Sequence, residues 1–324
     1  MALGEFELIE RFFRRPVRRA ALGVGDDCAL LAPATGMQLA ISTDMLVEGR
    51  HFLSTVDPSR LGHKALAVNL SDLAACGARP LAFSLALALP ESNPVFLEPF
   101  AQGLFALADA HNCELIGGDT TRGPLNICIT VFGEVPTGQA LLRSGARAGD
   151  DLWVSGHVGD ARLALEVFRG RRSLPAAAFE AARARMEQPA PRVALGLALR
   201  GVATSAIDIS DGLLGDLSHV LKASGVGARI DAPAAASLLA TDAALIEGGA
   251  DAVLELVLAG GDDYELAFTA PPAQRDAVAA AAAQAATRVT RVGCIEAQPG
   301  VRVVDAQGNA LSQHYASFDH FAQG

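Results

Sequence analysis

The sequence predicts an α/β protein of two domains. Three observations lead to this prediction: apolar strand-like runs alternate with helix-like segments, the 324 residues exceed one typical domain of roughly 100–200 residues, and a glycine-rich stretch divides the chain. We expect an N-terminal domain over residues 1–137, a connector over 138–150 and a C-terminal domain over 151–324.

The N-terminal half alternates between helical and extended patterns. Its first segment mixes glutamates with arginines over residues 5–19, which favours an amphipathic helix whose arginines are solvated rather than bound to a polyphosphate. A helix over residues 58–76 ends before Gly77 and Pro80, both of which disrupt helices. The other elements expected here are a helix over 94–112 and strands over 36–43, 81–89, 114–117 and 126–135.

The C-terminal half continues the alternation. In residues 211–224, leucine and valine recur at helical spacing and Gly225 follows as a C-cap, so this segment is expected to be an amphipathic helix. The alanine-rich residues 277–286 favour a surface helix. The remaining elements expected are helices over 159–168, 175–187 and 191–201, strands over 151–155, 205–209 and 254–261, and a final strand before the tail.

Composition excludes several classes of protein. A net charge of −10 and 5% aromatic residues argue against a nucleic-acid surface, which needs basic stripes or stacking platforms. No apolar run approaches the roughly 18 residues of a membrane span, and no secretory signal precedes the first helix. The five widely spaced cysteines indicate neither a disulfide framework nor a CxxC metal site. We therefore expect a cytoplasmic protein that binds neither nucleic acid nor membrane.

Aspartates follow several of the apolar runs, and this pattern predicts one metal site assembled from distant segments. Two like charges ~4 Å apart repel by about 4 kcal/mol at an effective dielectric near 20, so clustered carboxylates need cations or raised pKa values. Oxygen ligands without a His/Cys cluster suit Mg²⁺, which shares its coordination with water and substrate phosphates. The residues are Asp26, Asp27, Asp44, Asp72, Asp119, Asp208, Asp211, Asp262 and Asp263.

Each local motif also has an ordinary structural explanation. The sequence GVGDD over residues 23–27 is compatible with an Asx-turn, and Ser42, Thr43 and Asp44 are compatible with an N-cap cluster. The paired glycines of GGDTT over residues 117–121 allow a phosphate to approach the backbone closely. No GxxxxGK[ST] motif is present, which excludes a P-loop.

The remaining candidate residues also have more than one possible role. Asn69 and Asp72 share one helix face and either enter the cation site or are solvated. The segment DISDG over residues 208–212 resembles part of a calcium loop, but His219 stands where that loop requires an acid, and Asp211 also suits a helix N-terminus. Arg143 is either solvated or a bidentate phosphate ligand.

Taken together, the motifs resemble those of the thiamine-monophosphate kinase family over nearly the whole chain. They are GVGDDCALL, ISTDMLVEGRHF, KALAVNLSDLAACGARP, LIGGDTTRGP, AIDISDGLLGDLSHVLKASGVGARID and AGGDDYEL. The resemblance implies a two-domain aminoimidazole ribonucleotide synthetase-like fold, with an N-terminal sheet domain that dimerises and a C-terminal α/β domain. It also implies a homodimer that phosphorylates thiamine monophosphate to thiamine diphosphate with ATP.

The resemblance assigns roles residue by residue. It implies a Mg²⁺ shell of Asp27, Ser42, Thr43, Asp44, Asp72, Asp119, Asp208 and Asp211. It implies ATP contacts at Gly118, Asp119, Arg143 and Ser210, and substrate contacts at His51, Asp262 and Tyr315. The family commonly has Glu at the position of Asp262, so this shorter side chain reaches the thiamine moiety through water or leaves that role to Asp263.

Direct in-line transfer from ATP is the expected mechanism, because the acceptor phosphate is already a nucleophile and neither a covalent nucleophile nor a dedicated base is needed. Two alternatives stay open. One is another ATP-dependent synthetase of the superfamily, such as a purine-pathway or selenophosphate synthetase; the sequence lacks the reactive cysteine of the selenium enzyme. The other is a non-catalytic metal- or nucleotide-binding protein.

Overall fold

A computed structural model describes residues 4–311 and divides the chain into two compact units. Unit 1 comprises Met1–Leu73 and Ala78–Gly138, and unit 2 comprises Ala74–Gly77 and Gln139–Gly324. Each unit contains one sheet with helices packed on it, which confirms the expected α/β class. Among residues 4–311, none of the helices combines the length and apolarity needed to cross a bilayer.

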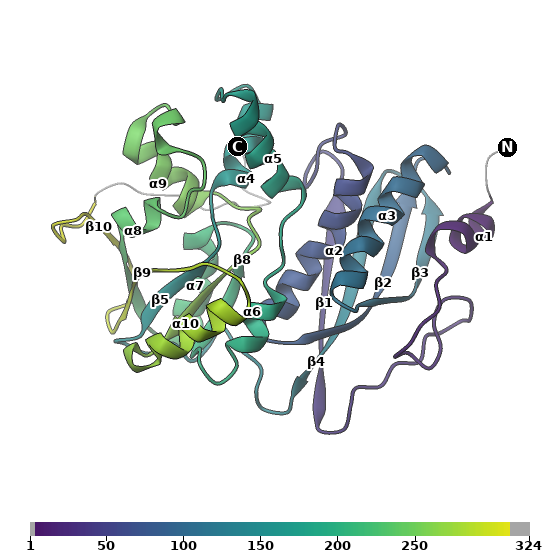
Figure 1. Cartoon of the computed structure of the whole chain (residues 1–324), viewed down its shortest axis with the longest axis horizontal. Coiled ribbons are helices and arrows are strands. Elements are labelled where there is room, and N and C mark those ends of the chain that lie inside the picture. The colour runs from purple at the N-terminus through teal and green to yellow at the C-terminus, as the bar shows by residue number, and fades with distance from the viewer. Residues whose placement is uncertain (1–3, 312–324) are drawn as a thin grey trace. The chain divides into compact units, whose positions relative to one another are not determined.

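Unit 1 is built on a four-stranded sheet of order β1-β4-β2-β3. The pairs β1/β4 and β4/β2 are antiparallel, and β2/β3 is parallel. Helices α2 and α3 lie side by side over one face of this sheet (Figure 1). The bounds are β1 Met37–Val47, α2 Pro58–Ala75, β2 Arg79–Leu89, α3 Pro94–Ala110, β3 Glu114–Arg122 and β4 Asn126–Pro136.

Two glycines allow α2 and α3 to approach closely. A Cβ on Gly62 would lie 2.0 Å from the carbonyl oxygen of Phe100, and one on Gly103 would lie 1.9 Å from that of Ser59. Any larger residue would push the backbones apart. The helix pair and the inner face of the sheet together bury Leu66, Leu70, Phe83, Leu87, Leu97, Phe100, Leu104, Ile127 and Ile129.

The N-terminal helix is shorter than predicted. It consists of α1 (Glu5–Leu8) and a π-helical turn, Ile9–Phe13, and the chain leaves the helix at Arg14. Beyond it, the backbone N–H groups of Arg18 and Arg19 donate to the carboxylate of Glu114, at 2.8 and 3.0 Å. Pro16 interrupts the helical pattern, so Arg18 and Arg19 belong to an irregular segment instead of a helical face.

Unit 2 is built on a six-stranded sheet of order β10-β7-β9-β5-β8-β6. The strands are β5 Asp151–Ser155, β6 Ser205–Ile209, β7 Gly227–Asp231, β8 Glu265–Ala270, β9 Val289–Glu296 and β10 Gly300–Val304. The helices are α4 Asp160–Phe168, α5 Ala176–Glu187, α6 Val193–Ala198, α7 Leu213–Ser224, α8 Ala232–Ala236, α9 Gly249–Ala259 and α10 Arg275–Gln284. Leucine, isoleucine and valine side chains from α7, α9 and the central strands form its largest core.

One element was predicted as the wrong type. Residues 254–261 were expected to be a strand, but Gly249–Ala259 forms helix α9. Its side chains are buried on several sides, at Val253, Leu254, Leu256, Val257 and Leu258, so the apolar run shows no helical periodicity. The acidic pair at Asp262 and Asp263 therefore follows a helix. Strands β7 and β8 were not predicted, and two strands, β9 and β10, precede the tail.

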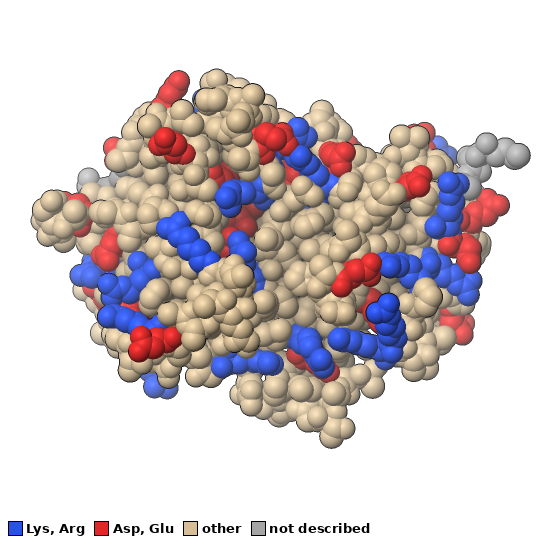
Figure 2. All heavy atoms as spheres, viewed as in Figure 1, with Lys and Arg blue, Asp and Glu red and all other residues tan. Residues whose placement is uncertain are grey.

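Charges of both signs are mixed on the visible face of the molecule. Figure 2 shows lysine and arginine side chains interspersed with aspartate and glutamate over that face. Some of the exposed charges form ion pairs: Arg15 lies 3.0 Å from Asp109, and Arg14 lies 2.7 Å from Glu10.

Candidate active site

The first group of predicted site residues lies where β1 meets α2 in unit 1. The Oγ of Ser42 donates a hydrogen bond of 2.5 Å to Oδ2 of Asp72. The backbone N–H of Asp44 donates to Oδ1 of Asn69 at 3.1 Å, and Nδ2 of Asn69 donates to the carbonyl of Ala65 at 3.0 Å. Asn69 is only 1% exposed. This asparagine is therefore a buried anchor for β1, not a solvated helix residue.

Thr43 points to the other face of the sheet, because side chains alternate along a strand. Its hydroxyl lies 2.8 Å from that of Thr130 on β4, the residue paired with it. Its neighbours on this face of β1 are Ile41 and Met45, which are 60% and 53% exposed. The side chain of Thr43 is thus separated from Ser42 and Asp72 by the sheet.

Asp119 and Gly118 lie on β3, at the opposite edge of the sheet from β1. Strands β1 and β3 are three inter-strand spacings apart, which corresponds to roughly 14 Å at about 4.8 Å per spacing. The expectation that Asp44 and Asp119 crowd together at neighbouring strand ends is therefore wrong within one unit. Both residues also lie inside their strands rather than at the ends. Strand order, which decides this separation, cannot be obtained from the spacing of the motifs.

The backbone at Gly118 requires glycine. Its φ is +150°, and a Cβ would lie 1.8 Å from the carbonyl oxygen of Leu85 on β2. The adjacent Gly117 has open space at the same position. Gly118 and Asp119 are both exposed, so this stretch of β3 presents backbone and a carboxylate to solvent.

Asp27 and His51 occupy loops of unit 1. The backbone N–H of Asp27 donates to Oδ1 of Asp26 at 2.8 Å, and the side chain of Asp27 is exposed. Nδ1 of His51 accepts a hydrogen bond of 3.0 Å from the backbone N–H of Val47. That contact places the proton of a neutral His51 ring on Nε2.

The second group of predicted site residues gathers around the turn between β6 and α7 in unit 2. Asp208 lies on β6 and is 7% exposed, and Ser210 and Asp211 form the turn itself. The backbone N–H of Asp262 donates to the carbonyl of Ser210 at 2.7 Å. The structure therefore brings the DISDG and GGDDY segments into contact.

A residue that sequence reasoning missed, Asp216, lies beneath this turn. Its Oδ2 accepts hydrogen bonds from the N–H groups of Ser210 and Asp211, both 3.0 Å long. Burial raises the pKa of Asp216 to about 7. The charge of Arg143 acts in the opposite direction, which places this arginine in the same electrostatic neighbourhood. The available signal was an acid in the first turn of α7, a common position with no specific meaning.

Asp262 and Asp263 have different environments. Asp262 is partly exposed and has a φ of +72°, an uncommon backbone conformation for a residue other than glycine. Asp263 points inward, where Oδ1 and Oδ2 accept from the N–H of Gly159 at 3.0 and 3.1 Å. Burial raises the pKa of Asp263, and the charges of the neighbouring Asp160 and Asp262 add to this effect. Asp262 is therefore the better placed of the two to meet a substrate.

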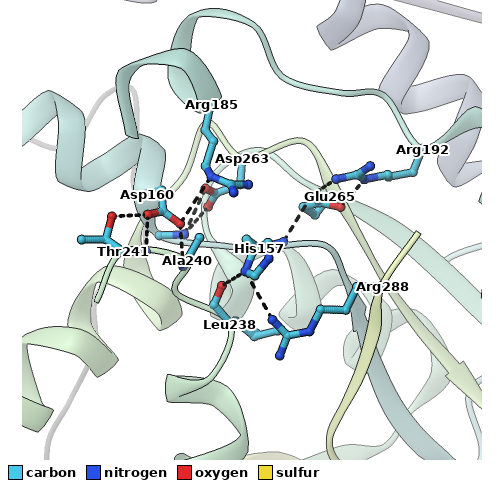
Figure 3. Close-up of polar contacts among 11 residues, drawn as sticks. His157, Asp160, Arg185, Arg192, Leu238, Ala240, Thr241, Asp263, Glu265 and Arg288 are labelled. Atoms are coloured by element: carbon cyan, nitrogen blue, oxygen red, sulfur yellow. Dashed lines mark hydrogen bonds and ion pairs between the residues drawn. The ribbon is translucent and has the colours of Figure 1, made fainter. Parts of the chain in front are cut away.

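Further buried carboxylates lie close to Asp263 (Figure 3). Glu265 pairs with both Nε and Nη2 of Arg192, at 2.6 and 2.5 Å, and accepts a hydrogen bond of 2.5 Å from Ser155. Asp160 accepts hydrogen bonds from the backbone N–H and the hydroxyl of Thr241, at 3.0 and 2.6 Å. These contacts hold the start of α4 and of β8.

The oxygen-rich donors of unit 1 fit a hard cation. Ser42, Asp44 and Asp72 supply hydroxyl and carboxylate oxygens, and Mg²⁺ needs only one or two protein carboxylates when phosphates and water complete its coordination. Within residues 4–311, no group of three or more His, Cys, Asp or Glu side chains is close enough to share an ion. Tyr315 lies outside the described residues, and the meeting of the two units' carboxylates at one site stays a prediction.

Comparison with known proteins decides the family. The family description "AIR synthase related protein, N-terminal domain" matches residues 25–135, and the corresponding C-terminal domain matches residues 147–306. The chain is 46% identical to the thiamine-monophosphate kinase of Salmonella typhimurium, over 99% of both chains, and 45% identical to that of Escherichia coli K12 over the same shares. The chain belongs to the thiamine-monophosphate kinase family.

Solved structures of the thiamine-monophosphate kinase family support the fold. That of Stenotrophomonas maltophilia K279a has a TM-score of 0.84 at 45% identity, covering 96% of this chain and 99% of that one. A structure described as AaThiL complexed with AMPPCP and TMP has a TM-score of 0.77 at 29% identity, covering 90% and 89% of the two chains. The aminoimidazole ribonucleotide synthetase-like fold implied by the motifs is confirmed.

Proposed function

We propose that this chain catalyses the ATP-dependent phosphorylation of thiamine monophosphate to thiamine diphosphate. The observation that carries the proposal is the match, over 99% of the chain, to curated thiamine-monophosphate kinases. The structure described as AaThiL complexed with AMPPCP and TMP supports the choice of both substrates. The reaction is one step of thiamine diphosphate biosynthesis.

The γ-phosphoryl group of ATP passes directly to a phosphate oxygen of thiamine monophosphate. That oxygen is the nucleophile, so the P–O bond to ADP breaks as the new P–O bond forms, and no phosphorylated side chain intervenes. The task of the protein is to align the two phosphates and to neutralise their charge. Bound Mg²⁺ would supply most of that neutralisation.

The residues divide between the two substrates. Asp27, Ser42, Asp44, Asp72, Asp119, Asp208 and Asp211 are proposed as ligands of several Mg²⁺ ions. Thr43 is left out of this set because its side chain lies on the other face of the sheet. Gly118, Asp119, Arg143 and Ser210 are proposed to contact ATP, and His51, Asp262 and Tyr315 to contact thiamine monophosphate. The partly exposed Asp262 is suited to meet the cationic thiazolium.

A homodimer is proposed through the face of the unit 1 sheet opposite α2 and α3. Leu39, Ile41 and Met45 alternate along β1 on this face and are 40%, 60% and 53% exposed. Such apolar exposure on a strand favours burial against another protein surface.

A cytoplasmic location is proposed from the cysteines, which form no disulfide among residues 4–311 and so suit a reducing compartment. They are Cys28, Cys76, Cys113, Cys128 and Cys294.

The deciding experiment measures ADP release from ATP with thiamine monophosphate and titrated Mg²⁺, with free thiamine as the comparison acceptor. We expect release only with the monophosphate, and thiamine diphosphate as the product. Asp119→Asn should lower kcat by roughly 100-fold with an unchanged fold, because a charge that meets the phosphates is lost. Asp276→Asn, an exposed acid on α10, is the control. Absence of thiamine diphosphate among the products would refute the proposal.

A further inference from the structure

The turn between β6 and α7 is held from below by one buried side chain, that of Asp216. Asp216 is the fourth residue of α7 and is 5% exposed. Its Oδ2 reaches back over the start of the helix and accepts from the N–H groups of Ser210 and Asp211. We propose that Asp216 is a positioning residue that sets the geometry of these two proposed ATP and metal contacts; the inference rests on the proposed function.

Hydrogen bonds on both sides fix the backbone conformation of the turn. The carbonyl of Ser210 accepts from the N–H of Asp262 at 2.7 Å, and that of Ile209 accepts from the N–H of Tyr264 at 2.8 Å. The carbonyls of the turn are thus held by the GGDDY segment, whereas two of its N–H groups are held by Asp216. Because buried peptide groups need partners, both sets of bonds are required to keep this one conformation.

On the side opposite Asp216, the turn packs closely against the backbone of residues 260–262. A Cβ on Gly212 would lie 2.6 Å from the carbonyl oxygen of Gly260, and one on Gly261 would lie 2.4 Å from that of Ser210. The turn is therefore confined between the 260–262 backbone and the Asp216 carboxylate. A change in the length of the Asp216 side chain therefore acts first on Ser210 and Asp211, the residues to which it is bonded.

A positioning role makes specific demands on the side chain at position 216. It needs an acceptor oxygen at the distance of the Asp carboxylate, but it does not need a negative charge. Asn keeps such an oxygen, Glu keeps the charge and moves the oxygen by one methylene, and Leu keeps the volume and removes the acceptor. The order of nucleotide affinity expected is therefore wild type, then Asp216→Asn, then Asp216→Glu and Asp216→Leu.

The test measures binding of AMPPCP with Mg²⁺ by calorimetry, together with the KM for thiamine monophosphate and the thermal unfolding midpoint. Since a displacement of about 1 Å can cost 10²-fold, we expect Asp216→Glu and Asp216→Leu to weaken AMPPCP binding by roughly 10- to 100-fold. Asp216→Asn should stay within about 5-fold of wild type. The KM for thiamine monophosphate should change much less than the AMPPCP affinity in every folded variant, and Asp276→Asn should match wild type throughout.

Two results would overturn the inference. The first is wild-type AMPPCP affinity in folded Asp216→Glu and Asp216→Leu. The second is a parallel loss of unfolding midpoint, nucleotide affinity and thiamine monophosphate KM, which indicates a purely structural role. If Asp216→Leu does not fold, the comparison of Asp216→Glu with Asp216→Asn decides alone. Binding of AMPPCP does not require turnover, so a wild-type protein inactive on thiamine monophosphate refutes the proposed function and leaves this test intact.

Discussion

The hydroxyl of Ser42 on β1 donates a 2.5 Å hydrogen bond to Oδ2 of Asp72 on α2. The bond joins two residues from different elements that are both proposed metal ligands, and it fixes the orientation of the Asp72 carboxylate relative to the strand. One oxygen of the Asp72 carboxylate is therefore held by the strand that also carries Asp44.

Ser42→Ala should weaken metal binding more than it weakens the fold. Loss of a side chain that orients or ligates the ion typically costs 10- to 100-fold in affinity, so we expect the Mg²⁺ concentration for half-maximal activity to rise roughly 10-fold or more. Thr130→Val is a matched control, since it removes the Thr43–Thr130 hydroxyl contact on the other face of the sheet. An unchanged Mg²⁺ titration for Ser42→Ala would contradict the assignment.

Gly118→Ala should destabilise the protein and abolish ATP-dependent turnover. The new Cβ would lie 1.8 Å from the Leu85 carbonyl oxygen at a φ of +150°, so the backbone of β3 has to move. We expect a loss of roughly 2–4 kcal/mol in the free energy of unfolding, measured by urea denaturation. Gly117→Ala is the neighbouring control, because its Cβ would meet nothing within 4 Å. Equal stability of the two variants would show that Gly118 is replaceable.

Arg192→Leu should strongly destabilise the protein. Glu265 is 3% exposed and Arg192 approaches it with two nitrogens, so the substitution leaves a carboxylate buried without its partner. Breaking such a pair typically costs about 3–5 kcal/mol in the free energy of unfolding. Arg14→Leu breaks the exposed Arg14–Glu10 pair and should leave the denaturation midpoint unchanged. A small effect of Arg192→Leu would mean that water replaces the guanidinium.

Asp151→Asn should have a pH-dependent effect on stability. Hydrogen bonds from Arg275 and Arg291 lower the pKa of Asp151 below its ordinary value of 3.8, although burial opposes them. A lowered folded-state pKa contributes stability that is present above the unfolded pKa and lost as the pH falls through the folded one. The substitution should therefore lower the free energy of unfolding most at pH 7 and progressively less below about pH 4. Urea denaturation of wild type and variant at pH 7 and below about pH 4 tests this prediction. A loss of unfolding free energy that is the same at both pH values would refute it.

Local patterns in the sequence were sufficient for the fold class and for many of the elements. The helices at α2 and α7 were predicted from apolar spacing and from the breakers Gly77 and Gly225, because both signals are encoded within one or two turns of the chain. The motif set around Asp44, Asp119 and Asp208 was likewise sufficient to identify the family, and the comparisons confirm it.

Features that depend on contacts between distant segments came only from the tertiary structure. The order β1-β4-β2-β3 separates Asp44 from Asp119, and nothing in either motif specifies which strands are neighbours. Helix α9 was mistaken for a strand because burial on several sides removes helical periodicity. The role of Asp216 depends on where a folded helix places its carboxylate relative to two backbone N–H groups. The sequence by itself therefore determined which groups this protein carries, whereas packing and hydrogen bonding in three dimensions decided which of them meet.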